Sequence, residues 1–273
     1  MGVVNRTPDS FSGDGLCDGV DEAIAHARAL VAAGADLLDI GAESTRPEAR
    51  PVEEAVELGR VLPLVEALVA KLGIPISIDT MKPAVARAAI AAGACFWNDV
   101  TALRFSPESL AVAGRSGASV VLMHMQGEPR TMQRDPHYDD VVTEVRDFLM
   151  QRARAALDAG VAPDRIWLDP GLGFGKRPEQ NLALLRGLPA IGELGFPVVV
   201  GASRKGLIRA LDPSARSPQD RLGGSIALAL AATRAGAAMV RVHDVRETVQ
   251  ALKVDAALRG LAPERASTST SLC

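Results

Sequence analysis

The sequence predicts an α/β protein that folds as a single (β/α)8 barrel, the TIM-barrel architecture. Eight short runs rich in β-branched residues alternate with longer alanine- and leucine-rich segments of helical period. These units repeat about every 30 residues without a break in composition, which favours a barrel over a doubly wound sheet. Hydrophobic residues make up 48% of the chain and aromatic residues 3%, which is typical of an aliphatic parallel sheet wrapped by helices.

The order of these segments gives the expected elements. The strands are expected at GVVN (2–5), DLLDIGA (36–42), PISIDT (75–80), CFWND (95–99), ASVVLMH (118–124), RIWLD (165–169), PVVVGA (197–202) and AMVRVH (238–243). The helices are expected at 21–34, 52–72, 83–93, 107–116, 139–159, 179–194, 219–236 and 245–259. Several helices end in a glycine, such as Gly73, because glycine adopts the left-handed conformation without a Cβ clash.

The same pattern sets the domain organisation and excludes two nucleotide-binding folds. Residues 1–260 form one barrel, and the small polar residues 261–273 are expected to form a disordered tail. In a Rossmann fold the glycine fingerprint follows the first strand, whereas PGLGFGK (170–176) follows the sixth. This stretch is not a Walker A loop either, since Lys176 is followed by Arg177 and not by Ser or Thr.

Charge and cysteine content narrow the possible partners. The formal net charge is −3 with both signs mixed along the chain, so no basic stripe indicates nucleic acid binding. Cys17, Cys95 and Cys273 lie far apart and are odd in number, which suggests neither a disulfide framework nor a zinc site and favours a reducing, cytoplasmic location. No signal peptide or long apolar run is present, so no membrane partner is expected.

Polar residues gather where the predicted strands end. In a barrel these ends share one face, which carries the functional side chains. The strand-end residues are Asn5, Glu43, Ser44, Thr45, Arg46, Asp79, Asn98, Asp99, His124, Asp169, Ser203, Arg204, Lys205, Arg241 and His243. The bodies of the strands are almost entirely aliphatic, so this polar rim predicts the site.

The rim residues divide into two chemical groups. The first group offers acceptors and a few donors suited to a flat heterocycle with several N–H groups and a carbonyl; its members are Asp79, Asn98, Asp169 and Lys205. The second group suits a phosphate or diphosphate, and its Asn5 can give an amide oxygen to Mg²⁺; its members are Asn5, Arg204, Arg241 and His243. The predicted ligand is therefore a heterocycle that carries a phosphate.

Several stretches at these positions resemble the dihydropteroate synthases. The stretches are NRTPDSFSGDG, DIGAESTRPEAR, SIDT, WNDV, LMHMQGEPRTMQ, LDPGLGFGK, GASRKGLI and VRVHDV, which follow in the family's order from residue 1 to about residue 260. The resemblance implies a homodimeric barrel enzyme of folate biosynthesis, a target of sulfonamides. It implies a transferase that joins (7,8-dihydropterin-6-yl)methyl diphosphate to 4-aminobenzoate, giving 7,8-dihydropteroate and pyrophosphate, with Mg²⁺ as cofactor.

The resemblance also implies roles for individual residues. Asp79, Asn98, Asp169 and Lys205 match the family's pterin pocket. The diphosphate residues are matched by Asn5, which would also hold the metal, Thr45, Arg241 and His243. The residues that close over the site and hold 4-aminobenzoate are matched by Phe11, Thr45, Arg46, Pro47, Ser203 and Arg204. Asp79, Lys205, Arg241 and His243 are expected to be the catalytic residues.

The implied mechanism needs no nucleophilic side chain. Diphosphate leaves first, helped by Mg²⁺ and cationic groups, and the resulting pterin methylene cation is then attacked by the arylamine. The sequence accordingly contains no GxSxG elbow and no HExxH motif.

Alternative interpretations remain beside this one. Asp79 or Asp169 could cap the following helix, and His243 could be a core histidine. The chain could be a non-catalytic or weakly active pterin-binding homologue; a pterin-dependent methyl carrier should lack the SRK and STRP elements that this chain has.

Three residues depart from the family pattern: Arg6, Glu48 and Glu128. Glu48 places a negative charge near the benzoate, and we expect it to weaken 4-aminobenzoate binding.

Overall fold

The computed structural model describes residues 1–6, 19–45, 49 and 51–261. Its strands are β1 (Gly2–Asn5), β2 (Leu38–Gly41), β3 (Ile76–Asp79), β4 (Phe96–Asp99), β5 (Ser119–Met123), β6 (Ile166–Asp169), β7 (Val199–Val200) and β8 (Met239–Val240). Each falls inside a segment predicted to be a strand. The predicted site residues Phe11, Arg46 and Pro47 lie outside the described residues, as do Glu48 and nearly all of the predicted tail.

The strands form a closed ring. Strands β1 to β6 are hydrogen-bonded in sequence order, and β7 pairs with β8, all in parallel. Two bridges complete the circle, from Leu168 of β6 to Val198 and from Gly2 of β1 to Val242. At the second junction the Val3 amide donates to the Val242 carbonyl at 3.1 Å. The predicted barrel is confirmed.

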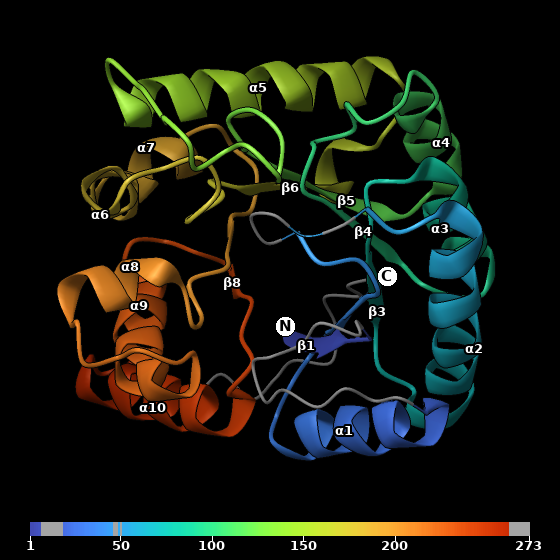
Figure 1. Cartoon of the computed structure of the whole chain (residues 1–273), viewed down its shortest axis with the longest axis horizontal. Helices are drawn as coiled ribbons and strands as arrows, with labels where there is room; N and C mark the ends of the chain where they lie inside the picture. Colours follow the sequence, from blue (N-terminus) through green and yellow to red (C-terminus); the bar gives the residue numbers. More distant parts are fainter. Residues whose placement is uncertain (7–18, 46–48, 50, 262–273) are drawn as a thin grey trace.

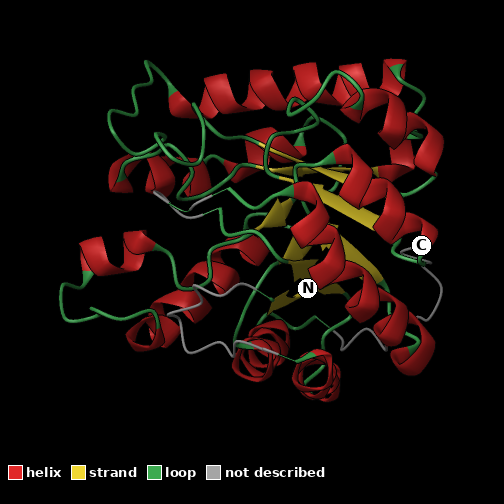
Figure 2. Ribbon diagram, turned by 45° about the vertical axis from the view of Figure 1, so that its right-hand side comes forward, coloured by secondary structure: helices red, strands yellow, loops and turns green. Residues whose placement is uncertain are grey.

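The helices surround this ring, as Figures 1 and 2 show. They are α1 (Val20–Ala32), α2 (Glu54–Leu72), α3 (Pro83–Ala91), α4 (Ser109–Ser116), α5 (Val141–Asp158), α6 (Pro178–Arg186), α7 (Leu188–Gly192), α8 (Gly206–Leu211), α9 (Leu222–Arg234) and α10 (Val245–Leu258), with short 3-10 turns η1 (Pro163–Arg165) and η2 (Gln219–Arg221). No helix in the described ranges combines the length and apolar character needed to cross a bilayer.

Two features of the helices differ from the prediction. The single helix expected at 179–194 is divided into α6 and α7, because Pro189 has no N–H to continue the ladder. Gly187 at the break packs tightly, since a Cβ there would lie 2.7 Å from Val142 Cγ2. The six-residue helix α8, which follows β7, was not predicted because its sequence is too short to show a helical period.

The described buried apolar residues form three clusters, and a small one at and beyond the carboxyl ends of β4 and β5 contains Val100, Met123, Met125 and Met132. Most buried aliphatic residues pack between the strands and the helices. A smaller cluster gathers residues from strand beginnings around the ring, including Met1, Leu37, Phe96 and Val199. Because this cluster fills the barrel near the amino ends of the strands, the polar side chains at the carboxyl ends face the other opening.

One cysteine differs from the expectation. Cys95, just before β4, is disulfide-bonded. The wide spacing of the cysteines gave no indication of this pairing.

Candidate active site

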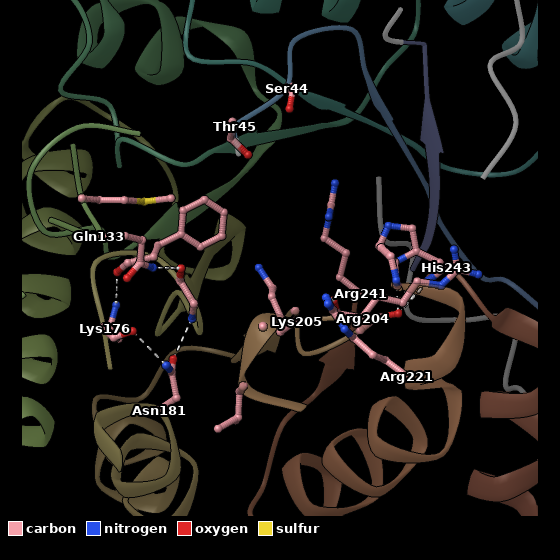
Figure 3. Close-up of a pocket in the computed structure, with 18 of the residues that line it drawn as sticks. Ser44, Thr45, Gln133, Lys176, Asn181, Arg204, Lys205, Arg221, Arg241 and His243 are labelled. Atoms are coloured by element: carbon pink, nitrogen blue, oxygen red, sulfur yellow. Dashed lines mark hydrogen bonds between the residues drawn. The ribbon is translucent and has the colours of Figure 1, made fainter. Parts of the chain in front are cut away.

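Most of the described site residues predicted from the sequence lie around one cavity. It has a volume of about 710 Å³ and opens at the carboxyl ends of the strands. The strand-end residues that line it are Asn5, Glu43, Ser44, Thr45, Asp79, Ser203, Arg204, Lys205, Arg241 and His243. In Figure 3, Lys205, Arg241 and His243 lie on one side, and Gln133 and Lys176 lie on the opposite side.

A charged network joins three strand ends beneath this cavity. Arg241, after β8, contacts Asp39 of β2 through Nε at 2.6 Å and Asp79 of β3 through Nη2 at 2.8 Å. The amide of Asn98, the neighbour of Asp79 in β4, donates to Asp39 at 3.1 Å. Asp39 is fully buried. It therefore supports both Arg241 and Asn98.

The environment of Asp79 sets its protonation. Burial raises the pKa of the Asp79 carboxyl to about 7; the Arg241 guanidinium acts in the opposite direction, and the neighbouring charge of Asp39 adds to the effect of burial. Burial opposes the charged form of Arg241 too, but Asp39 and Asp79 outweigh it and raise the pKa of Arg241 above its ordinary value. Arg241 therefore stays charged, while Asp79 titrates near neutral pH.

Asn98 and Asp169 do not line the cavity itself but lie buried at the ends of β4 and β6. Asp169 Oδ1 accepts a hydrogen bond from the Gly171 amide at 2.7 Å. Burial raises the pKa of Asp169, against that hydrogen bond and the nearby Lys205 ammonium. The predicted pterin residues thus form a floor of Asp79, Asn98 and Asp169, and Lys205 lines the same cavity.

The glycine-rich loop after β6 forms one wall of the cavity. Gly171 has a φ of 67°, and a Cβ on it would stand 1.9 Å from the carbonyl oxygen of His124. Only glycine permits this approach. The loop presents Phe174, whose ring centroid lies 4.3 Å from Lys205 Nζ, a cation–π contact.

A buried lysine holds this loop in place. Lys176 Nζ donates to the carbonyl oxygens of Gly171 and Phe174, each at 2.9 Å, and lies 2.9 Å from His124 Nδ1. Burial lowers the pKa of Lys176 to about 7. Burial, together with the charge of Lys176, lowers the pKa of His124 to about 2, so this imidazole is neutral. His124 is thus structural, although it belongs to the polar rim, and it does not line the cavity.

The loop after β7 adopts a strained conformation at the site. Arg204 has a φ of 58°, which is unfavourable for a residue with a side chain. Its guanidinium pairs with both oxygens of Asp244, at 2.6 and 3.0 Å. Ser203 Oγ lies 3.0 Å from His243 Nδ1. Arg204 therefore reaches the cavity already paired with a carboxylate, which the sequence did not indicate.

Arg6 links the root of the first loop to a helix. Its amide donates to the Gly41 carbonyl at 2.8 Å, and its Nη1 donates to the Arg60 carbonyl on α2 at 2.5 Å. This side chain thus serves to anchor the chain after β1, a role that the sequence left unassigned.

Several lining residues were not predicted from the sequence: Met132, Gln133, Phe174, Lys176, Asn181 and Arg221. Gln133 and Phe174 fall within the stretches that carry the family resemblance, so those stretches could have identified them as site residues. Asn181 and Arg221 lie on helical segments, so the strand-end rule could not identify them. Arg221 adds a cation beside Arg204 and Arg241 in Figure 3.

The described side chains do not make a metal site by themselves. Within the described ranges, no three His, Cys, Asp or Glu residues are grouped so as to hold a metal ion. A divalent cation beside Asn5 would take most of its ligands from a bound phosphate, as Mg²⁺ commonly does.

Known proteins are similar to this chain in both sequence and structure. The family described as "Pterin binding enzyme" matches residues 1–243. A dihydropteroate synthase of Synechocystis sp. is 46% identical over 259 residues, which cover 94% of this chain and 89% of that protein. The Yersinia pestis dihydropteroate synthase, solved with a sulfonamide drug complex, has a TM-score of 0.91 and 44% identity over 95% of this chain and 94% of that one. The Xanthomonas albilineans enzyme, solved with 7,8-dihydropteroate, has a TM-score of 0.85 and 47% identity over 96% and 94%.

Proposed function

The chain belongs to the dihydropteroate synthases, a family of pterin-binding enzymes, and from that premise we propose how its own residues perform the reaction. The enzyme condenses (7,8-dihydropterin-6-yl)methyl diphosphate with 4-aminobenzoate in folate biosynthesis. The products are 7,8-dihydropteroate and pyrophosphate. The roles of single residues, the metal and the order of bond changes are the proposed part.

The pterin ring binds over the acidic floor of the cavity. Ionised Asp79 and Asp169 accept hydrogen bonds from ring and amino N–H groups, Asn98 pairs with a mixed donor and acceptor edge, and Lys205 donates to the carbonyl. The support for this placement is that Asp79 and Lys205 line the cavity while Asn98 and Asp169 are buried beside them.

The diphosphate lies toward Asn5, Arg241 and His243. These residues line the same cavity, and Figure 3 shows further cations of Arg204 and Arg221 beside them. Mg²⁺, held by the Asn5 amide oxygen and by phosphate oxygens, would neutralise charge on the leaving group.

The observation that carries this assignment is the position of Arg241. Its guanidinium touches Asp79 at 2.8 Å in the pterin half and faces the anion half of the cavity. As the C–O bond breaks, its electron pair leaves with pyrophosphate, and Arg241, Lys205 and His243 stabilise that charge. The methylene cation left behind lies near the carboxylates of Asp79 and Asp169. The amine of 4-aminobenzoate then forms the new N–C bond and loses a proton.

A coupled assay tests the proposed function. Purified protein with both substrates and Mg²⁺ is expected to release pyrophosphate, and release should require 4-aminobenzoate. If the protein binds the dihydropterin but releases no pyrophosphate above background, it is instead a non-catalytic pterin-binding homologue.

The remaining expectations have direct tests. Omission of Mg²⁺ with added chelator is expected to abolish turnover, and light scattering is expected to give the mass of a homodimer. Both follow from the family resemblance, as does the cytoplasmic setting of the pathway.

A further inference from the structure

A buried ion cluster lies at the root of the loop between β2 and α2. Lys82, which precedes α3, has its Nζ 2.5 Å from Glu43 Oε2 and 2.5 Å from Glu57 Oε2. The three side chains are 10%, 8% and 0% exposed, in that order. Glu43 belongs to the loop, and Glu57 belongs to α2. The cluster therefore joins a loop of the site to the helical layer of the barrel.

The loop residue of this cluster is adjacent to the cavity. Glu43 lines the cavity itself, together with the next two residues, Ser44 and Thr45, which lie at one edge of it in Figure 3. The other oxygen of Glu43, Oε1, accepts a hydrogen bond from the Val52 amide at 3.1 Å. One carboxylate thus links Lys82 to the backbone of Val52, which lies two residues before α2.

Helix α2 and the loop after Asp79 provide the fixed points. Arg60 of α2 donates through Nη1 to the Ala42 carbonyl at 3.2 Å, so it holds the same root from a second direction. Lys82 lies three residues after Asp79, and its amide is tied back to Thr80 Oγ1 at 3.2 Å. The position of Thr45 is therefore linked to the segment that carries Asp79.

The charge balance argues against a cluster that serves stability alone. Lys82 and Glu57 alone would make a neutral buried pair. Burying the carboxylate of Glu43 as well costs further desolvation free energy, which a single ammonium group offsets poorly. Glu57 Oε1 has no hydrogen-bond partner in the structure. Burial by itself lowers the pKa of Lys82, but the hydrogen bonds that its ammonium donates to Glu43 and Glu57 outweigh this effect and raise the pKa. Lys82 is thus charged, and Glu43 is the member that stability does not require.

We propose that Lys82 is a positioning residue, which acts through Glu43 to hold the Thr45 loop where 4-aminobenzoate binds. This inference rests on the proposed function and deepens it, because it concerns how one of the two substrates is held. Loss of the Lys82–Glu43 ion pair should raise the KM for 4-aminobenzoate. It should leave the pterin floor unchanged, since Asp79, Asn98 and Asp169 are held by other contacts.

A matched pair of substitutions tests the proposal. Glu43→Leu and Glu57→Leu each remove one carboxylate and leave Lys82 in a neutral pair, but only Glu43→Leu releases the loop. Glu43→Leu is expected to raise the KM for 4-aminobenzoate between about tenfold and a hundredfold, with kcat and pterin affinity changed much less. Glu57→Leu is expected to change this KM by less than about threefold, since the Lys82–Glu43 tie persists. Glu54→Leu, at an exposed position of the same helix, is the control.

Lys82→Met in the Glu57→Leu background breaks the Lys82–Glu43 ion pair without removing a side chain that could contact the substrate, because Lys82 does not line the cavity. It is expected to reproduce the KM increase of Glu43→Leu. Lys82→Met alone would leave both carboxylates unpaired and is used only to measure the loss of thermal stability.

Amide hydrogen exchange gives a readout that does not depend on turnover. The Val52 amide is expected to exchange faster in Glu43→Leu and in the double variant, but not in Glu57→Leu. The proposal is overturned if Glu43→Leu leaves both the KM and the Val52 exchange unchanged, or if Glu57→Leu matches it in both. Failure of the proposed function would instead appear in the unmodified protein, as absent pyrophosphate release.

Discussion

Asp79 combines two properties that are unusual in one carboxylate. It is paired with Arg241 at 2.8 Å, and burial nevertheless raises its pKa to about 7. A carboxylate in this state accepts hydrogen bonds strongly when ionised but changes protonation within the physiological range. Ligand binding at this residue should therefore depend on its charge and on pH.

Replacing Asp79 should weaken pterin binding directly. Asp79→Asn is expected to reduce affinity for 6-hydroxymethyl-7,8-dihydropterin by roughly 1–3 kcal/mol, or about 5-fold to 150-fold, because a charged acceptor is lost. Isothermal titration calorimetry measures this, with Asp164→Asn at an exposed position as the control. Near-normal affinity in Asp79→Asn would contradict the assignment of the pterin half.

The pH dependence of the same binding has a defined direction. Below about pH 7 Asp79 takes up a proton, so affinity is expected to fall as the pH is lowered from 8.5 to 5.5. The ligand without diphosphate is used because a phosphate also titrates in this range. Asp79→Asn should remove the step. A step that persists in Asp79→Asn would assign the titration to another group.

At the scale of single elements, the loop after β6 has the most restrictive geometry. Gly171 approaches the His124 carbonyl, Lys176 ties the loop to the same residue, and Phe174 is thereby presented to Lys205. The loop is therefore a rigid wall, and its shape depends on backbone contacts that tolerate no side chain at Gly171.

Gly171→Ala and Gly195→Ala form a matched pair that tests this rigidity. Both residues have positive φ, but an alanine Cβ at Gly195 would meet no atom within 4 Å, whereas at Gly171 it would lie 1.9 Å from His124 O. Gly195→Ala is expected to lose about 1 kcal/mol of unfolding free energy and to keep its activity. Gly171→Ala is expected to lose pterin binding, or to fold poorly. Equal effects in urea denaturation and in calorimetry would show that the close approach is unimportant.

At the scale of the whole molecule, the site is built across the barrel closure. Arg241 follows the last strand, yet its partners Asp39 and Asp79 belong to the second and third strands. The ring closes through the contact of Val242 with β1, which brings these distant segments together. Formation of the site thus requires the complete ring.

Arg241→Met should therefore affect stability as well as activity. Removing the cation from a buried network typically costs about 3–5 kcal/mol of unfolding free energy. In the variant the pKa of Asp79 rises further above its unfolded value, so the folded state retains a proton that the unfolded state releases above about pH 4. Stability then falls as the pH rises, and urea denaturation should show a larger loss at pH 8 than at pH 5. Arg154→Met, at an exposed position on α5, is the control; an equal loss at both pH values would argue against the coupling.

The sequence predicted the features that have a local signal and missed those that depend on how distant segments pack. The apolar runs located all eight strands, because each strand is buried on both faces and reads as a continuous hydrophobic segment. The strand-end rule collected Asn5, Asp79, Lys205 and His243 into one cavity without any knowledge of contacts. It missed Asn181 and Arg221, because helical segments that turn toward the site have no strand-end signature.

The sequence alone determined the barrel, the polar rim and the family, since these depend on local periodicity and on motifs with fixed chemistry. The tertiary structure decided how the charges are paired. Arg204 pairs with Asp244, Lys176 lies against His124, and Lys82 joins Glu43 to Glu57. Each pair joins residues far apart in the chain, so pairing depends on closing the ring and on which side chains are then excluded from water. No local pattern in the sequence carries that information.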